Sequence, residues 1–285
     1  MSLKITTLIE NMPDKDGKLA YEHGFSVWIE LENEKILFDT GQTGAFAKNA
    51  EQLGIDLSVA DRIIVSHGHY DHTGGIPELL GKLKSRTPFY MGKEFFIPKY
   101  KLLEDGSYKY NGNPFEKELL MEDSEKHPKA ELHYIEEDVT RISEQLLLFK
   151  NFSRMTEYEK PNPKFYVKDA QNYIPDLFPD EIALGIITKQ GIVLIVGCSH
   201  VGIVNILNAV QKTTGLPVAA VLGGTHLVEA DKERLDKTAE AMKRYGVRTI
   251  AVSHCTGEAG MELLKREFPE GFVLNTTGTV LEFDI

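Results

Sequence analysis

Four apolar segments of this sequence end in the same way, with a few small residues followed by a histidine. They read RIIVSH, VLIVGCSH, AAVLGGTH and TIAVSH, and they end at His67, His200, His226 and His254. Each run has the length and composition of a short buried strand, and loops at strand ends are where a rigid sheet presents functional side chains. The repetition predicts a fold built on sheets whose strand ends carry histidines.

The first of these segments continues as HGHYDH, which adds His69, Asp71 and His72 to His67. In an extended segment, residues two apart lie on one side, so His67 and His69 can share one ion. Asp71 and His72 can then turn to a second position. Imidazole and carboxylate suit zinc, and also iron or manganese. We predict one or two divalent metal ions, zinc first and iron or manganese as alternatives, with further ligands from the other strand ends.

The order of the expected elements predicts an α/β fold. Strands are expected at 25–31, 35–41 and 60–66, with helices between and after them, and strands and helices alternate regularly from 182 onward. Two sheets covered by helices would accommodate this order, which predicts an αββα sandwich.

The amino-acid composition changes in residues 91–180, which are rich in lysine, glutamate and proline. Only short strand-like runs such as LHYIEED and QLLLFKN interrupt them. A structureless stretch of that length is improbable in a compact domain. We predict a mixed α+β subdomain at 91–180, inserted into a domain formed by 1–90 and 181–285.

Charge and composition restrict the kinds of molecule that this protein is expected to bind. The formal net charge is −11, whereas nucleic-acid binding needs a basic face, so neither a nucleic-acid partner nor a nuclease activity is expected. No apolar run approaches the roughly 18 residues that cross a bilayer, and the first residues do not read as a signal peptide. Two cysteines are too few for a disulfide scaffold, which favours the cytoplasm. We expect a small-molecule substrate; the oligomeric state stays open.

The motif HGHYDHTGG resembles the signature of the metallo-β-lactamase-fold superfamily, and the likeness extends to LFDTG, which contains Asp39. The segments GCSHVGIVN, LGGTHL and SHCTG are together similar to one branch, named for 7,8-dihydropterin-6-ylmethyl-4-(β-D-ribofuranosyl)aminobenzene-5′-phosphate synthase. This resemblance covers both halves of the chain. It implies an αββα sandwich with a metal site at the sheet edges.

The resemblance also implies two metal positions, the first held by His67, His69 and His200 and the second by Asp71, His72 and His254. The superfamily usually supplies a bridging aspartate where this chain has GCSH. Cys198 is therefore either a thiolate ligand or a small buried residue. His226 either binds metal or contacts substrate, and a structural role is the alternative. Asp39 is expected to orient a ligand histidine. His23 is expected to be a solvated loop residue.

The activity implied is that of a hydrolase acting on a small, phosphorylated molecule through a metal-bound hydroxide. Asp71 would be the catalytic residue that orients the nucleophile and accepts its proton. One alternative is a transferase that displaces pyrophosphate from a dihydropterin by a ribofuranosylaminobenzene phosphate. Another is a di-iron redox protein.

Overall fold

The computed structural model describes residues 2–121 and 130–285, whose strands form two seven-stranded sheets and one four-stranded sheet. The first large sheet has the order β18 (Val280–Asp284), β1 (Ser2–Ile9), β2 (Ser26–Leu31), β3 (Glu34–Phe38), β4 (Arg62–Ile64), β5 (Thr87–Gly92) and β8 (Ala130–Ile135). Its first four strands are antiparallel, and β3, β4, β5 and β8 are parallel.

The second large sheet is built in a similar way. Its order is β17 (Phe272–Leu274), β16 (Thr249–Val252), β15 (Val218–Gly223), β14 (Gly191–Val196), β13 (Ala183–Thr188), β10 (Leu146–Phe149) and β9 (Val139–Arg141). Strands β14 to β17 run parallel, so their carboxyl ends meet at one edge. The third sheet is small and antiparallel, in the order β12 (Asn172–Pro175), β11 (Phe165–Asp169), β6 (Lys99–Leu102) and β7 (Tyr108–Tyr110).

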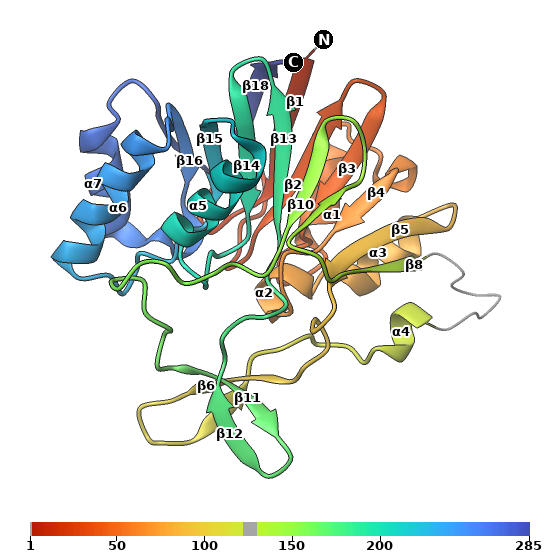
Figure 1. Cartoon of the computed structure of the whole chain (residues 1–285). Coiled ribbons are helices and arrows are strands. Elements are labelled where there is room, and N and C mark those ends of the chain that lie inside the picture. The colour runs from red at the N-terminus through yellow and green to blue at the C-terminus, as the bar shows by residue number, and fades with distance from the viewer. Residues whose placement is uncertain (1, 122–129) are drawn as a thin grey trace.

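Helices cover the outer face of each large sheet (Figure 1). On the first sheet lie α1 (Ala45–Gln52), the 3-10 turn η1 (Leu57–Val59) and α3 (Ile76–Lys82). On the second lie α5 (Ile203–Thr214), α6 (Lys232–Arg244) and α7 (Gly257–Glu267). The short helices α2 (Tyr70–Thr73) and α4 (Glu118–Met121) and the 3-10 turn η2 (His254–Thr256) complete the described elements. Among residues 2–121 and 130–285, no helix is long and apolar enough to cross a membrane.

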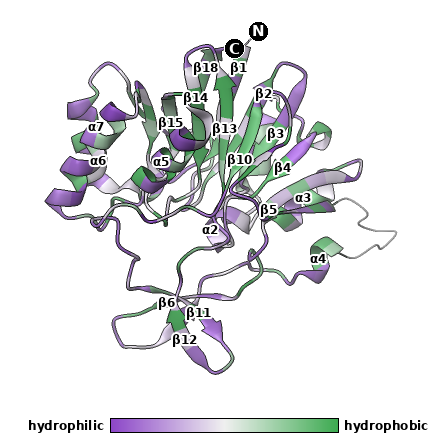
Figure 2. Ribbon diagram, viewed as in Figure 1, coloured by the Kyte–Doolittle hydropathy of each residue, from purple (hydrophilic) through white to green (hydrophobic). Residues whose placement is uncertain are grey.

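The central strands of both large sheets are apolar, as their green colour in Figure 2 shows. Their side chains are buried on both faces. In β14, for example, Ile192 and Leu194 pack under the helices, while Val193 and Ile195 face the first sheet. Side chains alternate between the faces of a strand, so a strand covered on both sides offers few positions for a polar residue. The predicted αββα sandwich is confirmed.

The segment predicted as an inserted subdomain contributes to all three sheets. The run LHYIEED forms much of β8 in the first sheet, and QLLLFKN contains β10 in the second. The β6–β7 and β11–β12 hairpins form the small third sheet, which projects from the end of the sandwich near α2 (Figure 1). Residues 122–129 of this segment lie outside the described residues. The subdomain boundaries at 91 and 180 stay a prediction.

Candidate metal centre

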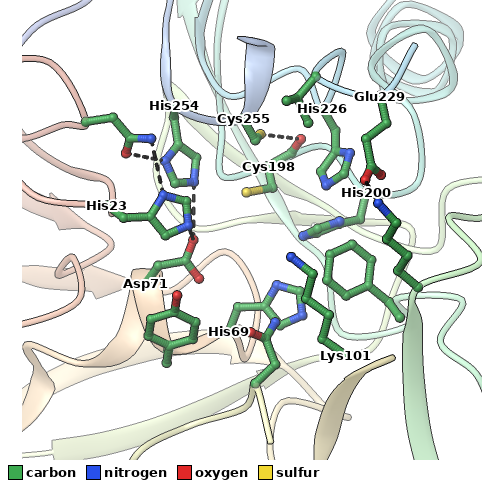
Figure 3. A pocket seen from close by; sticks show the side chains of 16 residues that line it. His23, His69, Asp71, Lys101, Cys198, His200, His226, Glu229, His254 and Cys255 are labelled. Atoms are coloured by element: carbon green, nitrogen blue, oxygen red, sulfur yellow. Dashed lines mark hydrogen bonds and ion pairs between the residues drawn. The ribbon is translucent and has the colours of Figure 1, made fainter. Parts of the chain in front are cut away.

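The residues predicted as metal ligands converge at the edge of the sandwich from loops of both large sheets. Figure 3 shows those that line the pocket at this edge, among them His69, Asp71, His200 and His254. The loop after β4 and the helix α2 carry HGHYDH, while β14, β15 and β16 lead to His200, His226 and His254. Gly197 lets these loops approach, because a Cβ there would lie 2.2 Å from Ser66 Oγ and 3.1 Å from His67 Nδ1. The small residues before the histidines are thus needed for contact between the two sheets' loops.

Backbone strain also gathers at this edge. Asp39, Ser199, His226 and His254 have positive φ values of 56°, 60°, 47° and 49°. Residues other than glycine adopt this left-handed region at a cost, and such residues cluster where a site requires a particular side-chain direction. The fold therefore holds these residues in place through the surrounding packing.

The first group of converging side chains consists of His67, His69 and His200. One nitrogen from each lies within 4.8 Å of the others, and all three residues are buried. Burial is the main cause that holds the pKa of each imidazole well below its usual value, so all three are neutral at neutral pH. His69 Nε2 and both ring nitrogens of His200 are buried without a hydrogen-bond partner among the described residues. Neutral imidazoles with unpartnered nitrogens fit a metal ion.

The second group consists of Asp71, His72, Cys198 and His254, again with ligand atoms within 4.8 Å of one another. His72 Nε2 lies 3.2 Å from both Cys198 Sγ and His254 Nε2, and His254 Nε2 lies 3.4 Å from Asp71 Oδ2. Burial alone would raise the pKa of Asp71, but nearby His72 and the contacts with His23 and His254 outweigh it and hold the pKa well below its usual range. Asp71 is therefore a carboxylate at neutral pH.

Asp39 holds His72 from behind. Its Oδ2 is 2.6 Å from His72 Nδ1 and accepts a hydrogen bond from Ser66 Oγ, while Oδ1 accepts one from Ser66 N. Because a carboxylate accepts, Nδ1 is the protonated nitrogen, and Nε2 is left facing the second group. This geometry agrees with the orienting role predicted for Asp39, which stays a prediction.

The structure places Cys198 and His226 differently. Cys198 Sγ is part of the second group, at the sequence position where a bridging aspartate was expected, and burial raises the pKa of its thiol. His226 belongs to neither group; its ring centre is 4.5 Å from that of His200, and burial lowers its pKa to about 4. His226 is thus a neutral imidazole beside the first group.

Sequence reasoning missed several residues that hold the site together. His23 is half-exposed, but its Nε2 is 3.2 Å from Asp71 Oδ2 and its ring stacks on His254. The buried carboxylate of Glu181 accepts the backbone N–H groups of His200 and Val201, each at 2.8 Å. The sequence around His23 or Glu181 contains no motif that indicates these contacts, because each contact joins residues that are distant in the chain.

One pocket lies over both groups, with a volume of about 290 Å³. Its walls include Tyr70 from α2 and Phe165 from the small third sheet. Lys101 from the same sheet and Glu229 from the loop after β15 also line it (Figure 3). The third sheet therefore supplies the wall that faces the two groups. This arrangement can hold one or two metal ions at the base of a pocket for a small molecule.

Comparison with known proteins gives the same family for sequence and structure. The model of the metallo-β-lactamase superfamily matches residues 21–145. A protein of Methanocaldococcus jannaschii named 7,8-dihydropterin-6-methyl-4-(β-D-ribofuranosyl)-aminobenzene-5′-phosphate synthase is 30% identical over 99% of this chain and 97% of its own length. The chain belongs to the metallo-β-lactamase superfamily. The predicted resemblance to this superfamily and to its synthase branch is confirmed.

Two further relatives align with almost the full length of this chain. An uncharacterised protein of the same organism, MJ0448, is 31% identical over 97% of this chain and 99% of its own length. The crystal structure of Tm1679, described as a metal-dependent hydrolase of the β-lactamase superfamily, is 31% identical, has a TM-score of 0.83 and covers 99% of this chain and 100% of that one. The chain is thus an enzyme of a metal-dependent superfamily.

The two groups of this metallo-β-lactamase fold differ in the protons that a metal ion must displace. The imidazoles of the first group are already neutral, as the lowered pKa of His67 illustrates. In the second group, the charges of Asp39 and Asp71 outweigh burial and raise the pKa of His72. Burial also raises the pKa of the Cys198 thiol in this group. Lower pH favours the protons on His72 and Cys198 and so weakens metal binding at the second group alone. The first group then keeps its ion because its imidazoles have no proton to lose.

We therefore expect unequal metal affinities that diverge as the pH falls. After dialysis at about pH 8 the protein should retain two ions, and at about pH 6 only the one held by the first group, since imidazole titrates between these values. Metal analysis at each pH, and titration of zinc into stripped protein, measure this. A single step with two equivalents at both values would contradict it.

Proposed function

We propose that this protein is a metal-dependent hydrolase that cleaves a phosphate ester or anhydride bond in a small molecule. The observation that carries the proposal is the pair of buried ligand groups under one pocket, one made of neutral imidazoles and the other containing a carboxylate. The first metal position would be held by His67, His69 and His200, and the second by Asp71, His72, His254 and Cys198. Divalent ions there would act as Lewis acids and lower the pKa of a bound water.

The side chains around these positions supply the rest of the chemistry. Asp71 is a buried carboxylate that lines the pocket, so it can orient the attacking water by accepting a hydrogen bond. His23 and His254 fix the direction of Asp71 through its Oδ2 atom. His226 is neutral and lines the same pocket, so its N–H can donate to an oxygen of the substrate or leaving group.

A second candidate is the transferase reaction. It is favoured by the full-length relative at 30% identity, which is named as a synthase of a dihydropterin joined to a ribofuranosylaminobenzene phosphate. In that reaction an arylamine would take the place of water and displace pyrophosphate from the dihydropterin. Both reactions need a metal site beside a group that binds phosphate oxygens, so they place the same demand on the two ligand groups.

Substrate and product analysis separates the two candidates. The zinc-loaded protein should hydrolyse one member of a panel of phosphomonoesters, phosphodiesters and diphosphates, but not a lactone. The same sample should be offered a dihydropterin diphosphate with and without the arylamine phosphate, and the products should be identified by mass spectrometry. A coupled product formed faster than the hydrolysed pterin would establish the transferase instead.

The metal content of this sample tests the third alternative. A colourless protein that is active with zinc would exclude a di-iron redox role. A separate variant, His69→Ala, tests whether hydrolysis depends on the first metal position, because it removes an unpartnered nitrogen of the first group. Panel activity that survives this change would contradict a hydrolysis that depends on the first metal position.

A further inference from the structure

Strand β6 carries two lysines on one face, and their surroundings differ sharply. Lys99 is 1% exposed, and its Nζ lies 2.7 Å from Asp176 Oδ2 and 2.8 Å from Asp180 Oδ1. Lys101 lies two residues further on, and no carboxylate of the described residues comes within 4.0 Å of its ammonium group. Figure 3 shows this ammonium pointing into the pocket. One lysine is neutralised, and the other faces the metal ligands uncompensated.

The other charges around the pocket are already balanced. Lys164 pairs with Glu229, which also accepts a hydrogen bond from the Asn162 amide, and these partners hold the pKa of Glu229 below its usual value against the effect of burial. The carboxylate of Asp71 is engaged by His23 and His254. Among the described residues that line the pocket, Lys101 is thus the cation without an acidic partner.

Two side chains that can donate hydrogen bonds line the same pocket as Lys101. Asn111 lines the same pocket and is held to β6 by its backbone N–H, which donates to the Lys99 carbonyl at 2.9 Å. Tyr70 also lines the pocket, and its phenol can donate a hydrogen bond. A pocket that offers an ammonium, an amide and a phenol is suited to a tetrahedral oxyanion.

We infer that Lys101 binds a second anionic group of the substrate, a phosphate carried at the end remote from the bond that is cleaved. The inference rests on the proposed function, because the first phosphate is the one placed at the metal ligands. It restricts the substrate to small molecules with two phosphate-type groups on a short spacer, within a pocket of about 290 Å³. Lys101 is then a residue that determines specificity.

Binding of ligands that cannot be hydrolysed tests this inference. We would titrate zinc-loaded protein by calorimetry with propylphosphonate and with the ethane, propane and butane bisphosphonates that carry a phosphonate at each end. The wild-type protein should bind the best bisphosphonate at least about tenfold more tightly than propylphosphonate, since a hydrogen bond to a charged group contributes this much. Lys101→Met should abolish the preference and leave propylphosphonate binding within about twofold, and Lys101→Arg should retain it.

Lys109 provides a matched control. It lies directly opposite Lys101 in the register of β6 and β7, but it does not line the pocket. Lys109→Met should therefore keep the preference. Equal losses in the two methionine variants would show a diffuse charge effect and overturn the inference, as would a wild-type protein without any preference. Because these ligands are not turned over, a preference in a protein that hydrolyses nothing would refute the proposed function but not the role of Lys101.

Discussion

Asp71→Asn is expected to lower turnover by about a thousandfold or more while the fold stays intact, the range for losing a group that both binds metal and handles a proton. The amide keeps the shape of the carboxylate. It removes the negative charge that faces His72 and His254 in the second group. The fold should survive because Asp71 is held by histidines of the site, not by the apolar cores of the sandwich.

The measurement pairs kinetics with metal content. Asp71→Asn should retain the ion of the first group, lose that of the second, and unfold thermally close to the wild type in the metal-free state. Asp105→Asn is the control, since Asp105 is exposed in the β6–β7 hairpin, where its carboxylate accepts hydrogen bonds from Ser107. Unchanged activity with two bound ions would show that Asp71 is outside the mechanism.

The parts of this fold that could be predicted from sequence are those fixed by local patterns. The strands that end at His67, His200, His226 and His254 are short apolar runs closed by small residues, and such runs need burial wherever they occur. The HGHYDH loop is also local, because its ligands are neighbours in the chain. For this reason the αββα sandwich could be predicted from the sequence. The division of the ligands into two groups came from the resemblance to the superfamily, and the metal-binding role of these residues stays a prediction.

What could not be predicted depends on distant segments of the chain. The place of Cys198 beside His72 follows from the packing of a loop from one sheet against a loop from the other, 126 positions away. His23 approaches Asp71 only because the loop before β2 folds over α2. Lys99 sits in a stretch of surface-like composition, and its partners Asp176 and Asp180 are 77 and 81 positions away. No periodicity in the sequence encodes such pairings.

The ion triad formed by Lys99, Asp176 and Asp180 links the third sheet to the metal-binding loops. Asp180 Oδ2 accepts the N–H of Gly68, between His67 and His69, at 2.8 Å. Asp176 Oδ1 accepts the N–H of Phe178 at 2.7 Å, and the Phe178 ring stacks on His200 at 3.9 Å and 7°. The triad therefore contacts both sides of the first group.

Removing the lysine of this triad is expected to be costly. Burial would lower the pKa of Lys99, but Asp180 and Asp176 outweigh it, so the ammonium is charged. Lys99→Met leaves two buried carboxylates side by side, and breaking a buried ion pair in this way costs about 3–5 kcal/mol of unfolding free energy. The carboxylates would then take up a proton or move apart, which shifts Gly68 and Phe178 and weakens the first metal position.

Two variants make this expectation specific to the triad. Lys99→Met combined with Asp176→Asn and Asp180→Asn removes all three charges but keeps amide oxygens that can accept from Gly68 and Phe178, so it should recover much of the stability, as neutral replacements of whole buried ion groups often do. Lys150→Met removes another buried lysine, whose Nζ lies 3.0 Å from Glu94 Oε2. This pair includes none of the metal ligands. Lys150→Met should lower stability without changing metal affinity. Chemical denaturation of the metal-free proteins and zinc titration measure the two quantities separately. If Lys99→Met loses stability but binds its first zinc ion as tightly as the wild type, the triad supports the fold alone. If Lys99→Met is as stable as the wild type, the charges of the triad are dispensable.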